Sequence, residues 1–193
     1  MTQTDAFADK QEMILNAAFH AFAAYGFRRT TMDDIARGAG MSRSALYLHF
    51  SNKEDIFRSL TERHFNNTIR DMERALNMPG RSPAEALHAA FVAKDGKFMD
   101  VVLGTPHGRE LLDAGFSLAA DIAEAGEVRM TEVLAAFLKR HRLAPGVGTA
   151  DEMSETLNAA LKGLKFAATS LDAYRAGQAR LAALFAMALS SPD

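Results

Sequence analysis

The sequence predicts an all-α protein of about nine helices, and three observations support this fold class. Apolar residues recur three and four positions apart along most of the 193 residues, the spacing that lines one face of a helix. No segment alternates apolar and polar residues for long between turn signals, so no sheet is expected. Residues that begin and end helices, namely Ser, Thr, Pro and Gly, separate the periodic stretches.

The most informative segment runs from Ile14 to Leu60, where the pattern predicts three short helices and the start of a fourth. The second and third helices are joined by the turn Ala39-Gly40-Met41-Ser42, in which Gly40 can adopt a left-handed backbone. Two helices joined by a turn of this length have helix-turn-helix spacing, which places the second helix in the major groove of DNA. Residues 31–50 are therefore predicted to be a DNA-reading unit.

Small polar residues predict where the helices of this segment begin. Thr31 with Asp34 three positions later has the spacing of a capping box, and Ser51 with Glu54 has the same spacing. Ser42 is expected to cap the third helix, because a hydroxyl there accepts a hydrogen bond from a free backbone amide.

Further helices are expected after the fourth, which should continue to Leu76. Ser82-Pro83 puts a proline at a first helical position, and Ser117 is expected to cap a later helix. The predicted ranges are about 82–103, with a loosening of the helix at Asp95-Gly96, and then 105–114, 117–141, 150–171 and 173–190.

Composition excludes several kinds of site and location. The chain has no cysteine, so disulfides and thiolate metal sites are excluded, and no cofactor is predicted. The N-terminus is polar and lacks the apolar region of a signal peptide. No apolar run approaches the roughly 18 residues that a membrane-spanning helix needs. We therefore expect a cytoplasmic protein without membrane contact.

Charge is distributed unevenly along the chain. The net charge is −2, yet residues 28–53 contain five cationic and two acidic side chains, which leaves the rest of the chain at −5. A basic patch on an otherwise acidic protein can bind phosphate locally while the remaining surface repels DNA. Charge alone does not decide the matter, because a window of this length can reach such a value by chance.

The third helix of this segment carries residues suited to DNA contacts. Ser42 lies at its N-terminus, where free amides and the helix dipole favour a phosphate. Arg43 and Ser44 occupy the first turn, which usually meets base edges, and Arg43 could bond a guanine through two hydrogen bonds. Tyr47 and His49 follow on the later turn and could reach the DNA backbone.

Two more residues are candidate phosphate contacts. Lys53 lies in the first turn of the fourth helix, where its charge opposes the helix dipole unless a phosphate lies against it. Thr31 lies at the start of the second helix. Each candidate has an ordinary explanation alone, as a helix cap, a packed ring or a solvated charge, and it is their joint occurrence on one short unit that favours DNA binding.

The segment resembles the DNA-binding domain of the tetracycline-repressor (TetR) family of bacterial transcription regulators. The resemblance covers about residues 13–60, a quarter of the chain, and its motif combination is far more specific than a lone helix-turn-helix. The matching residues are Gly26-Phe27, Thr30-Thr31, Ile35-Ala36, Ala39-Gly40-Met41-Ser42, Leu46-Tyr47, His49-Phe50 and Lys53-Glu54. It implies a DNA-binding domain over residues 1–60 and a helical ligand-binding and dimerisation domain over residues 61–193.

The resemblance also implies roles for individual residues. It implies base contacts from Arg43, Ser44 and Tyr47, and phosphate contacts from Thr31, Ser42, Tyr47, His49 and Lys53. Two positions depart from the common pattern. Ser44 stands where many members have glycine, and Leu48 where many have a polar or aromatic residue, so the operator sequence cannot be carried over.

A homodimer through the last two helices, residues 150–171 and 173–190, is a further implication of the resemblance. Small residues at Ala159, Ala160, Gly163 and Ala167 would allow helices to approach closely there. A symmetric dimer presents two reading helices and requires a roughly palindromic double-stranded DNA operator.

The resemblance further implies a pocket for a small-molecule effector in the C-terminal domain. Apolar and aromatic side chains could line it and a few polar ones could anchor a ligand, although such residues at helical spacing more often form a core. The candidates are His88, Phe91, Phe98, Met99, His107, Phe116, Met130, Phe137, Lys162 and Phe166.

Together these observations predict a sequence-specific transcription regulator, a repressor that a small apolar or amphipathic ligand releases from its operator. An activator or a ligand-independent regulator with the same fold, and a non-specific DNA binder, are alternatives. A helical enzyme is disfavoured. His107 and Glu110 lie three apart, but paired Glu-x-x-His elements, a phosphate-binding glycine loop and a zinc-binding His-Glu-x-x-His are absent from the sequence.

Overall fold

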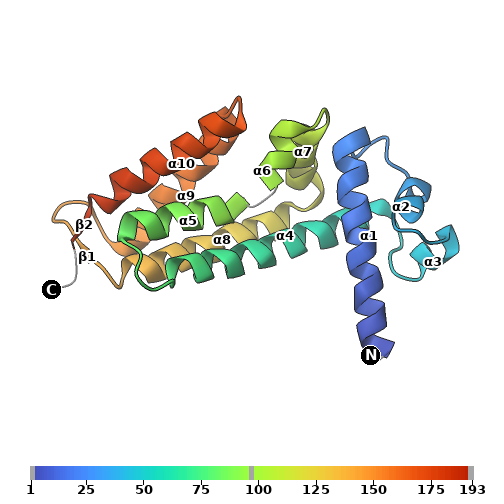
Figure 1. The fold of residues 1–193 in the computed structure, drawn as a ribbon, viewed down its shortest axis with the longest axis horizontal. Helices are drawn as coiled ribbons and strands as arrows, with labels where there is room; N and C mark the ends of the chain where they lie inside the picture. The colour runs from blue at the N-terminus through green and yellow to red at the C-terminus, as the bar shows by residue number, and fades with distance from the viewer. Residues whose placement is uncertain (1–2, 96–97, 191–193) are drawn as a thin grey trace. The chain divides into compact units, whose positions relative to one another are not determined.

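The structure, a computed structural model, describes residues 3–95 and 98–190, and at residues 3–6, 115, 116 and 190 it describes the backbone alone. Within these ranges the chain forms ten helices and two short strands, which confirms the all-α prediction (Figure 1). The helices are α1 (Gln3–Tyr25), α2 (Met32–Gly38), α3 (Arg43–Tyr47), α4 (Lys53–Leu76), α5 (Pro83–Asp95), α6 (Phe98–Gly104), α7 (Gly108–Leu118), α8 (Ala120–Leu138), α9 (Ala150–Ala167) and α10 (Leu171–Ala186).

Several predicted helix boundaries were wrong. Residues 82–103 were expected to form one helix; the structure describes α5 up to Asp95 and α6 from Phe98, and residues 96 and 97 lie outside the described residues, so the continuity of this helix stays a prediction. Ser117 does not cap a helix, because it lies inside α7 and its hydroxyl donates instead to the carbonyl oxygen of Ala114 at 3.2 Å. A serine can cap a helix or bond back to the preceding turn, and sequence alone does not choose between these.

The caps near the N-terminus were predicted more accurately. Thr31 and Asp34 form the expected capping box at α2, and the Ser42 hydroxyl accepts a hydrogen bond from the backbone amide of Ala45 at 3.1 Å. The exception is α4, where Asn52 rather than Ser51 accepts the hydrogen bond from the amide of Asp55. Serine and asparagine both suit a cap, and the pattern did not distinguish position 51 from position 52.

Two strands were not expected. β1 (Arg142–Leu143), after α8, pairs antiparallel with β2 (Leu189–Ser190), after α10, with Leu143 opposite Leu189. The backbone amide of Ala144 extends the pairing by donating to the carbonyl of Ala188 at 2.9 Å. A strand of two residues is too short to show the alternation that predicts a strand from sequence. The pair forms because the ends of α8 and α10 bring these two segments together.

The described helices form two compact units. The first consists of Met1–His64 and Val101–Ala123, and the second of Phe65–Asp100 and Glu124–Asp193, so α4, α6 and α8 contribute residues to both. The predicted domain boundary at residue 60 stays a prediction. No helix among the described residues is long and apolar enough to cross a membrane.

The first unit has an aromatic centre. α1 packs against α2 and α7, and Phe22, Phe27 and Phe57 lie with ring centroids 5.2–5.9 Å apart. Ile35 of α2 and Leu46 of α3 are completely buried. Because each of these two short helices buries one side against α1 and its neighbours, its other side remains available for contacts outside the protein.

The second unit has an apolar core in which α5 lies alongside α10, as Figure 1 also shows. Its completely buried members include Leu87, Phe91, Leu134 and Leu157. Gly126 of α8 lies directly against the ring of Phe65, where any side chain would collide with that ring. The identity of residue 126 is therefore set by the close approach of α4 and α8.

Candidate nucleic-acid interface

The helix-turn-helix has the geometry that the sequence predicted. Gly40 adopts a left-handed backbone with φ of +67°, and the amide of Met41 donates to the carbonyl of Ala36 at 3.0 Å. Beyond the turn, Ser42 is extended at ψ 155° before α3 begins. The turn thus orients α3 relative to α2 through backbone conformation, independently of the exposed side chains.

Thr31 is exposed and already engaged within the protein. Its side-chain oxygen accepts from the amide of Asp34 at 3.2 Å, and its hydroxyl donates to the Asp34 carboxylate at 2.6 Å. The hydrogen bonds from Thr31 hold the pKa of Asp34 below its ordinary value. Thr31 therefore starts α2 in this structure, and a phosphate contact would have to share or replace its bond to Asp34.

Ser42 and Ser44 lie at the N-terminus of α3, both exposed. Their hydroxyl oxygens are 3.0 Å apart, within hydrogen-bond distance, while the oxygen of Ser42 also caps the helix. The hydroxyl at position 44, where a glycine would have none, thus joins the two first-turn side chains. Either hydroxyl can still accept or donate one more hydrogen bond.

Arg43 is the most highly connected of the predicted base-reading residues. Its Nη1 donates to both carboxylate oxygens of Asp33, at 2.9 and 3.1 Å, and its Nη2 donates to the hydroxyl of Tyr47 at 3.4 Å. Its guanidinium carbon lies 5.5 Å from the centroid of the Tyr47 ring. The hydrogen bond to Tyr47 and the charge of Asp33 raise the pKa of Arg43.

His49 is partly buried rather than projecting into solvent. Its ring lies 4.3 Å, centroid to centroid, from the ring of Phe7 on α1. Its Nδ1 atom is buried and has no hydrogen-bond partner among the described residues. A DNA contact from His49 would have to use the other ring nitrogen.

Lys53 donates to three backbone carbonyls in the connection between α1 and α2. Its Nζ lies 2.9 Å from the oxygen of Phe27, 3.1 Å from that of Arg28 and 3.2 Å from that of Thr30. The ammonium also lies 4.6 Å from the centroid of the Phe27 ring. An ammonium has three N–H donors, so these carbonyls occupy all of them in this structure.

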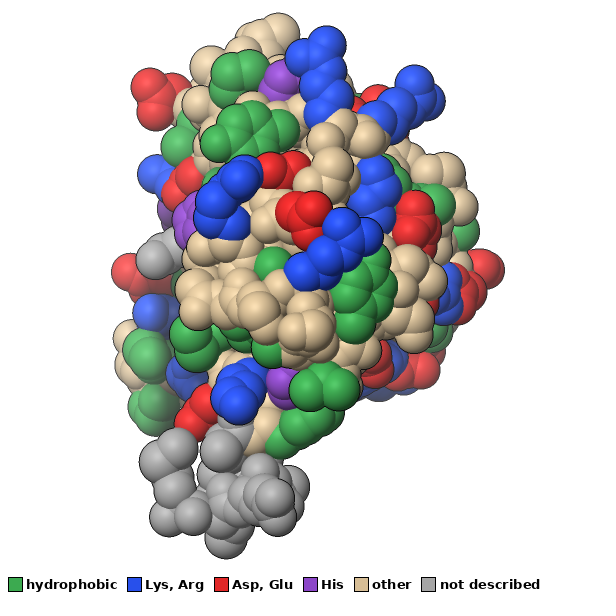
Figure 2. All heavy atoms as spheres, turned by 90° about the vertical axis from the view of Figure 1, so that its right-hand side faces the viewer, with side chains coloured by type: hydrophobic (Ala, Val, Ile, Leu, Met, Phe, Trp, Pro, Cys, Tyr) green, Lys and Arg blue, Asp and Glu red, His purple; other side chains and the backbone are tan. Residues whose placement is uncertain are grey.

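Two of the five cationic side chains of residues 28–53 form ion pairs with the two acidic residues of the same segment. Arg37 forms an ion pair with Asp34, and Arg43 forms one with Asp33. Figure 2 views the molecule from the right-hand side of Figure 1, the side of α2 and α3, and shows arginine and lysine side chains interspersed with acidic ones. Such a surface favours local phosphate contacts over strong non-specific attraction.

Sequence reasoning missed three residues that support this interface. Asp33 was counted only as a negative charge, and Asn52 was passed over as a cap. Glu110 of α7 accepts a hydrogen bond from the amide of Arg28 at 3.1 Å and lies against Gly26, in the connection that leads to α2. No local sequence signal could have identified Glu110, because its contact depends on how α7 packs against α1.

The predicted ligand residues do not gather at one site in the structure. Phe91, Met130 and Phe137 are buried in the core of the second unit. Met99 is also buried, His88 and Phe98 are partly buried, and Lys162 and Phe166 are exposed on α9. His107 belongs to the first unit, where its Nδ1 atom lies 3.7 Å from Oε2 of Glu110. The side chain of Phe116 lies outside the described residues. Their proposed role stays a prediction.

A groove in the second unit runs between α4 and α8, and none of the predicted ligand residues lines it. Its walls carry apolar, acidic and cationic side chains. They are Ile69, Glu73, Leu76, Asn77, Arg129, Glu132, Val133, Ala136 and Arg140.

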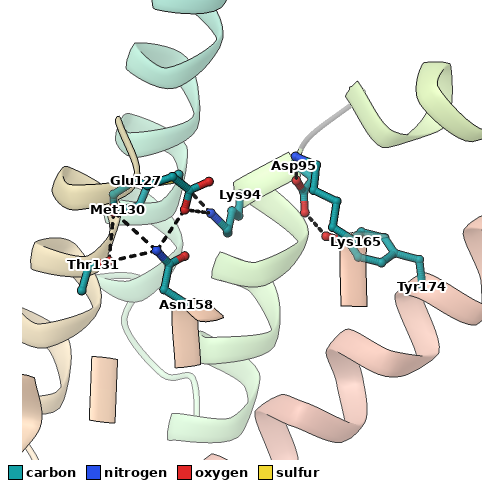
Figure 3. A network of polar contacts seen from close by, with 8 residues as sticks. All are labelled: Lys94, Asp95, Glu127, Met130, Thr131, Asn158, Lys165 and Tyr174. Atoms are coloured by element: carbon teal, nitrogen blue, oxygen red, sulfur yellow. Dashed lines mark hydrogen bonds and ion pairs between the residues drawn. The ribbon is translucent and has the colours of Figure 1, made fainter. Parts of the chain in front are cut away.

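A buried polar network in the second unit was also missed (Figure 3). Lys94, which is 4% exposed, donates to Glu127 at 3.1 Å, and Glu127 also accepts from the side-chain amide of Asn158 at 2.9 Å. Burial lowers the pKa of Lys94. The Oδ1 atom of Asn158 is buried without a hydrogen-bond partner among the described residues.

The neighbouring residue on α5 begins a second arm of this network. Asp95 accepts from Lys165 at 2.9 Å and from the hydroxyl of Tyr174. Although burial alone would raise the pKa of Asp95, the charge of Lys165 and the bond from Tyr174 hold it below its ordinary value. Burial and the charge of Asp95 raise the pKa of Tyr174. The network thus joins α5, α8, α9 and α10.

Comparison with known proteins agrees with the geometry of the first unit. Residues 14–60 match the family model described as bacterial regulatory proteins, tetR family. The chain is 32% identical over 93 residues to the uncharacterized HTH-type transcriptional regulator YerO of Bacillus subtilis, covering 48% of this chain and 32% of YerO. It is 34% identical over 68 residues to the HTH-type transcriptional activator FasR of Mycolicibacterium smegmatis, covering 35% of this chain and 31% of FasR. The alignments span about a third of each relative.

Solved structures extend the likeness of fold over most of the chain. SmeT, the repressor of the Stenotrophomonas maltophilia multidrug efflux pump SmeDEF, matches with a TM-score of 0.68 at 22% identity over 93% of this chain and 90% of SmeT. The SmeT–triclosan complex matches with a TM-score of 0.65 at 21% identity over the same shares of the two chains. At sequence identities of 21% and 22%, the similarity to SmeT shows a shared fold and nothing about ligands or DNA sequence.

Proposed function

We propose that the chain is a sequence-specific, DNA-binding transcription regulator, a proposal supported by the match of residues 14–60 to the tetR family of bacterial regulatory proteins. The observation that carries this proposal is the construction of α3. Leu46 anchors its buried side, the turn at Gly40 orients it, and Arg43, Ser44 and Tyr47 remain exposed on it. A helix held in this way can enter the major groove with its side chains directed at base edges.

The proposed contacts divide into two kinds. Arg43 and Ser44, in the first turn of α3, contact base edges, and Arg43 suits a guanine. Ser42 and Tyr47 contact phosphates, which position the helix without specifying sequence. Thr31, His49 and Lys53 complete the proposed set of phosphate contacts, with residues 1–60 as the DNA-binding domain and residues 61–193 as the regulatory domain.

A homodimer through α9 and α10 is the second part of the proposal. Ala159, Gly163 and Ala167 are exposed on α9, and the position that a side chain on Gly163 would occupy is open space. On α10, Leu184 is 63% exposed. Small and apolar residues exposed along neighbouring helices support close packing against the same helices of a second copy, which would present two reading helices to a palindromic operator.

The regulatory part of the proposal is repression relieved by a small apolar or amphipathic molecule. SmeT, which shares the fold, is described as a repressor and as a complex with triclosan. A ligand that binds better to the conformation with poorly spaced reading helices would lower DNA affinity by that difference. Such a regulator would work in the cytoplasm, where bacterial DNA lies.

Activation rather than repression is the second candidate. FasR, which is related over the N-terminal segment, is described as an activator. The sign of regulation depends on where an operator lies relative to a promoter, and no residue of the chain records it. Non-specific DNA binding is disfavoured because the acids on the basic surface reduce phosphate neutralisation. An enzymatic role is disfavoured because the relatives are described as transcription regulators.

The decisive experiment is a selection of short duplexes from a random library by the purified protein at about 0.15 M salt. Enrichment of one palindromic motif is the expected result, and the enriched duplex then defines the operator. Recovery of all sequences without a motif would contradict the proposal. Loss of the enrichment in Arg43→Ala, with retained thermal stability, would connect the motif to α3.

A further inference from the structure

The side chains of Asp33, Arg43 and Tyr47 form a cluster, called here the Arg43 cluster, on the exposed surface of α2 and α3. The Nη1 atom of Arg43 donates to the carboxylate of Asp33 on α2. The Nη2 atom of Arg43 donates to the hydroxyl of Tyr47, one turn further along α3. A guanidinium has five N–H donors, so these two partners leave donors for a third group.

The neighbouring carboxylate cannot take the place of Asp33. Asp34 is committed to the capping box with Thr31 and to an ion pair with Arg37. Of the two acids that open α2, one is therefore used to start the helix and the other reaches across to α3. Asp33 is therefore the acidic residue of α2 that contacts Arg43.

Folding stability does not explain this contact well. The side chains of Arg43 and Asp33 are 60% and 55% exposed, and exposed pairs of this kind contribute little to the stability of the fold. A carboxylate beside the predicted reading residue also repels DNA phosphates, so it weakens binding to any sequence. Asp33 therefore contributes little to folding stability and weakens binding to DNA of any sequence. An effect on the discrimination between DNA sequences explains its contact with Arg43 better.

We propose that Asp33 is a specificity-determining positioning residue that holds the Arg43 guanidinium against Tyr47 in one orientation for reading a base. This inference rests on the proposed DNA-binding function. A long side chain ordered before binding loses less freedom when it contacts the correct base. Its fixed orientation gives little benefit on a wrong sequence, where the negative charge of Asp33 still opposes binding.

The test compares Asp33→Asn with the unaltered protein on two duplexes of equal length. One carries the motif enriched by selection and the other carries a scrambled sequence. Asp33→Asn is expected to bind scrambled DNA more tightly and to reduce the ratio of motif to scrambled affinity by about two- to tenfold, the range for ordering one long side chain. A change in the base preference profile at one motif position should accompany this loss.

A double-mutant cycle separates positioning from charge. In an Arg43→Ala background, Asp33→Asn should leave the affinity ratio unchanged, because there is no guanidinium to orient. Glu54→Gln removes a carboxylate from an exposed position of the same unit and is expected to leave the ratio unchanged. Thermal melting checks that each variant remains folded.

Each other result overturns part of the proposal. If Asp33→Asn raises the ratio or leaves it unchanged, Asp33 competes with the base or has no effect on reading. If it lowers the ratio equally in the Arg43→Ala background, or if Glu54→Gln lowers it as much, the effect comes from general charge. If the unaltered protein shows no preference between the duplexes, the proposed sequence-specific function itself fails.

Discussion

Lys53 donates a hydrogen bond to the carbonyl oxygen of Phe27 at 2.9 Å, and its ammonium lies 4.6 Å from the centroid of the ring of the same residue. The first turn of α4 is thereby connected to the chain segment between α1 and α2. Sequence patterns assigned Lys53 to a phosphate, whereas the structure gives it a role in holding the helix-turn-helix in place. The two roles can be separated experimentally.

Replacing Lys53 with Met should lower the free energy of unfolding by about 1–3 kcal/mol, because three carbonyl oxygens lose a charged donor. Urea unfolding followed by circular dichroism measures this change. Lys10→Met, which alters an exposed lysine of α1, is the control and should have little effect. If Lys53→Met unfolds like the unaltered protein and only DNA affinity falls, Lys53 is a phosphate contact without a structural role.

Gly163→Arg should convert the proposed dimer to monomers without unfolding the subunit. The position is exposed and open within the subunit, so an arginine can be accommodated there, but it would prevent close approach of a second copy. Sedimentation velocity at micromolar concentration measures the change. Ala125→Arg, at an exposed position of α8, should leave the dimer intact. A dimer that survives Gly163→Arg would place the interface elsewhere.

Lys94→Met should destabilise the second unit by about 3 kcal/mol, the lower end of the range for breaking a buried ion pair. The lower end applies because Glu127 is 19% exposed and retains its hydrogen bond from Asn158. The comparison variant is Lys139→Met, which removes a surface ion pair with Asp151 and should change stability by less than about 1 kcal/mol. Equal melting temperatures for the two variants would show that the network contributes little.

Asp121 should make the first unit sensitive to acid. Two hydrogen bonds from Arg58, at 2.7 and 2.8 Å, lower the pKa of Asp121 from 3.8 to about 2. Since the pKa is lower in the folded state, the stabilisation is fully present above pH 3.8 and is lost as the pH falls through about 2.

The measurement is the difference in unfolding free energy between the unaltered protein and Asp121→Asn as a function of pH. The difference should shrink between pH 3.8 and about 2. Asp113→Asn, at an exposed position of α7, serves as the reference substitution. A difference that stays constant over this range would mean that Arg58 does not hold Asp121 in its charged form.

Local relationships account for what could be read from the sequence. Thr31 and Asp34 are three residues apart, so their capping box forms wherever this segment becomes helical. The turn at Gly40 and the buried positions of α2 and α3 likewise depend on neighbours within one or two turns of chain. Where two local solutions compete, as with Ser51 and Asn52, the pattern predicted a cap but chose the wrong residue.

The remaining features depend on segments that the sequence does not place side by side. The ion pair of Arg43 with Asp33 requires the angle between α2 and α3, and the bonds of Lys53 require α4 to pack against the end of α1. The network of Lys94 and Asp95 draws on four helices, and β1 meets β2 only after α8 and α10 have packed.

The sequence by itself determined the helical class and the helix-turn-helix, because hydrophobic periodicity and capping are short-range properties of the chain. Its match to the tetR family covers residues 14–60. The tertiary structure decided which charges are paired, which polar groups are buried and which predicted ligand residues lie in the core. Those outcomes depend on distances across packed helices, where burial strengthens electrostatic interactions and makes every unpaired polar group unfavourable.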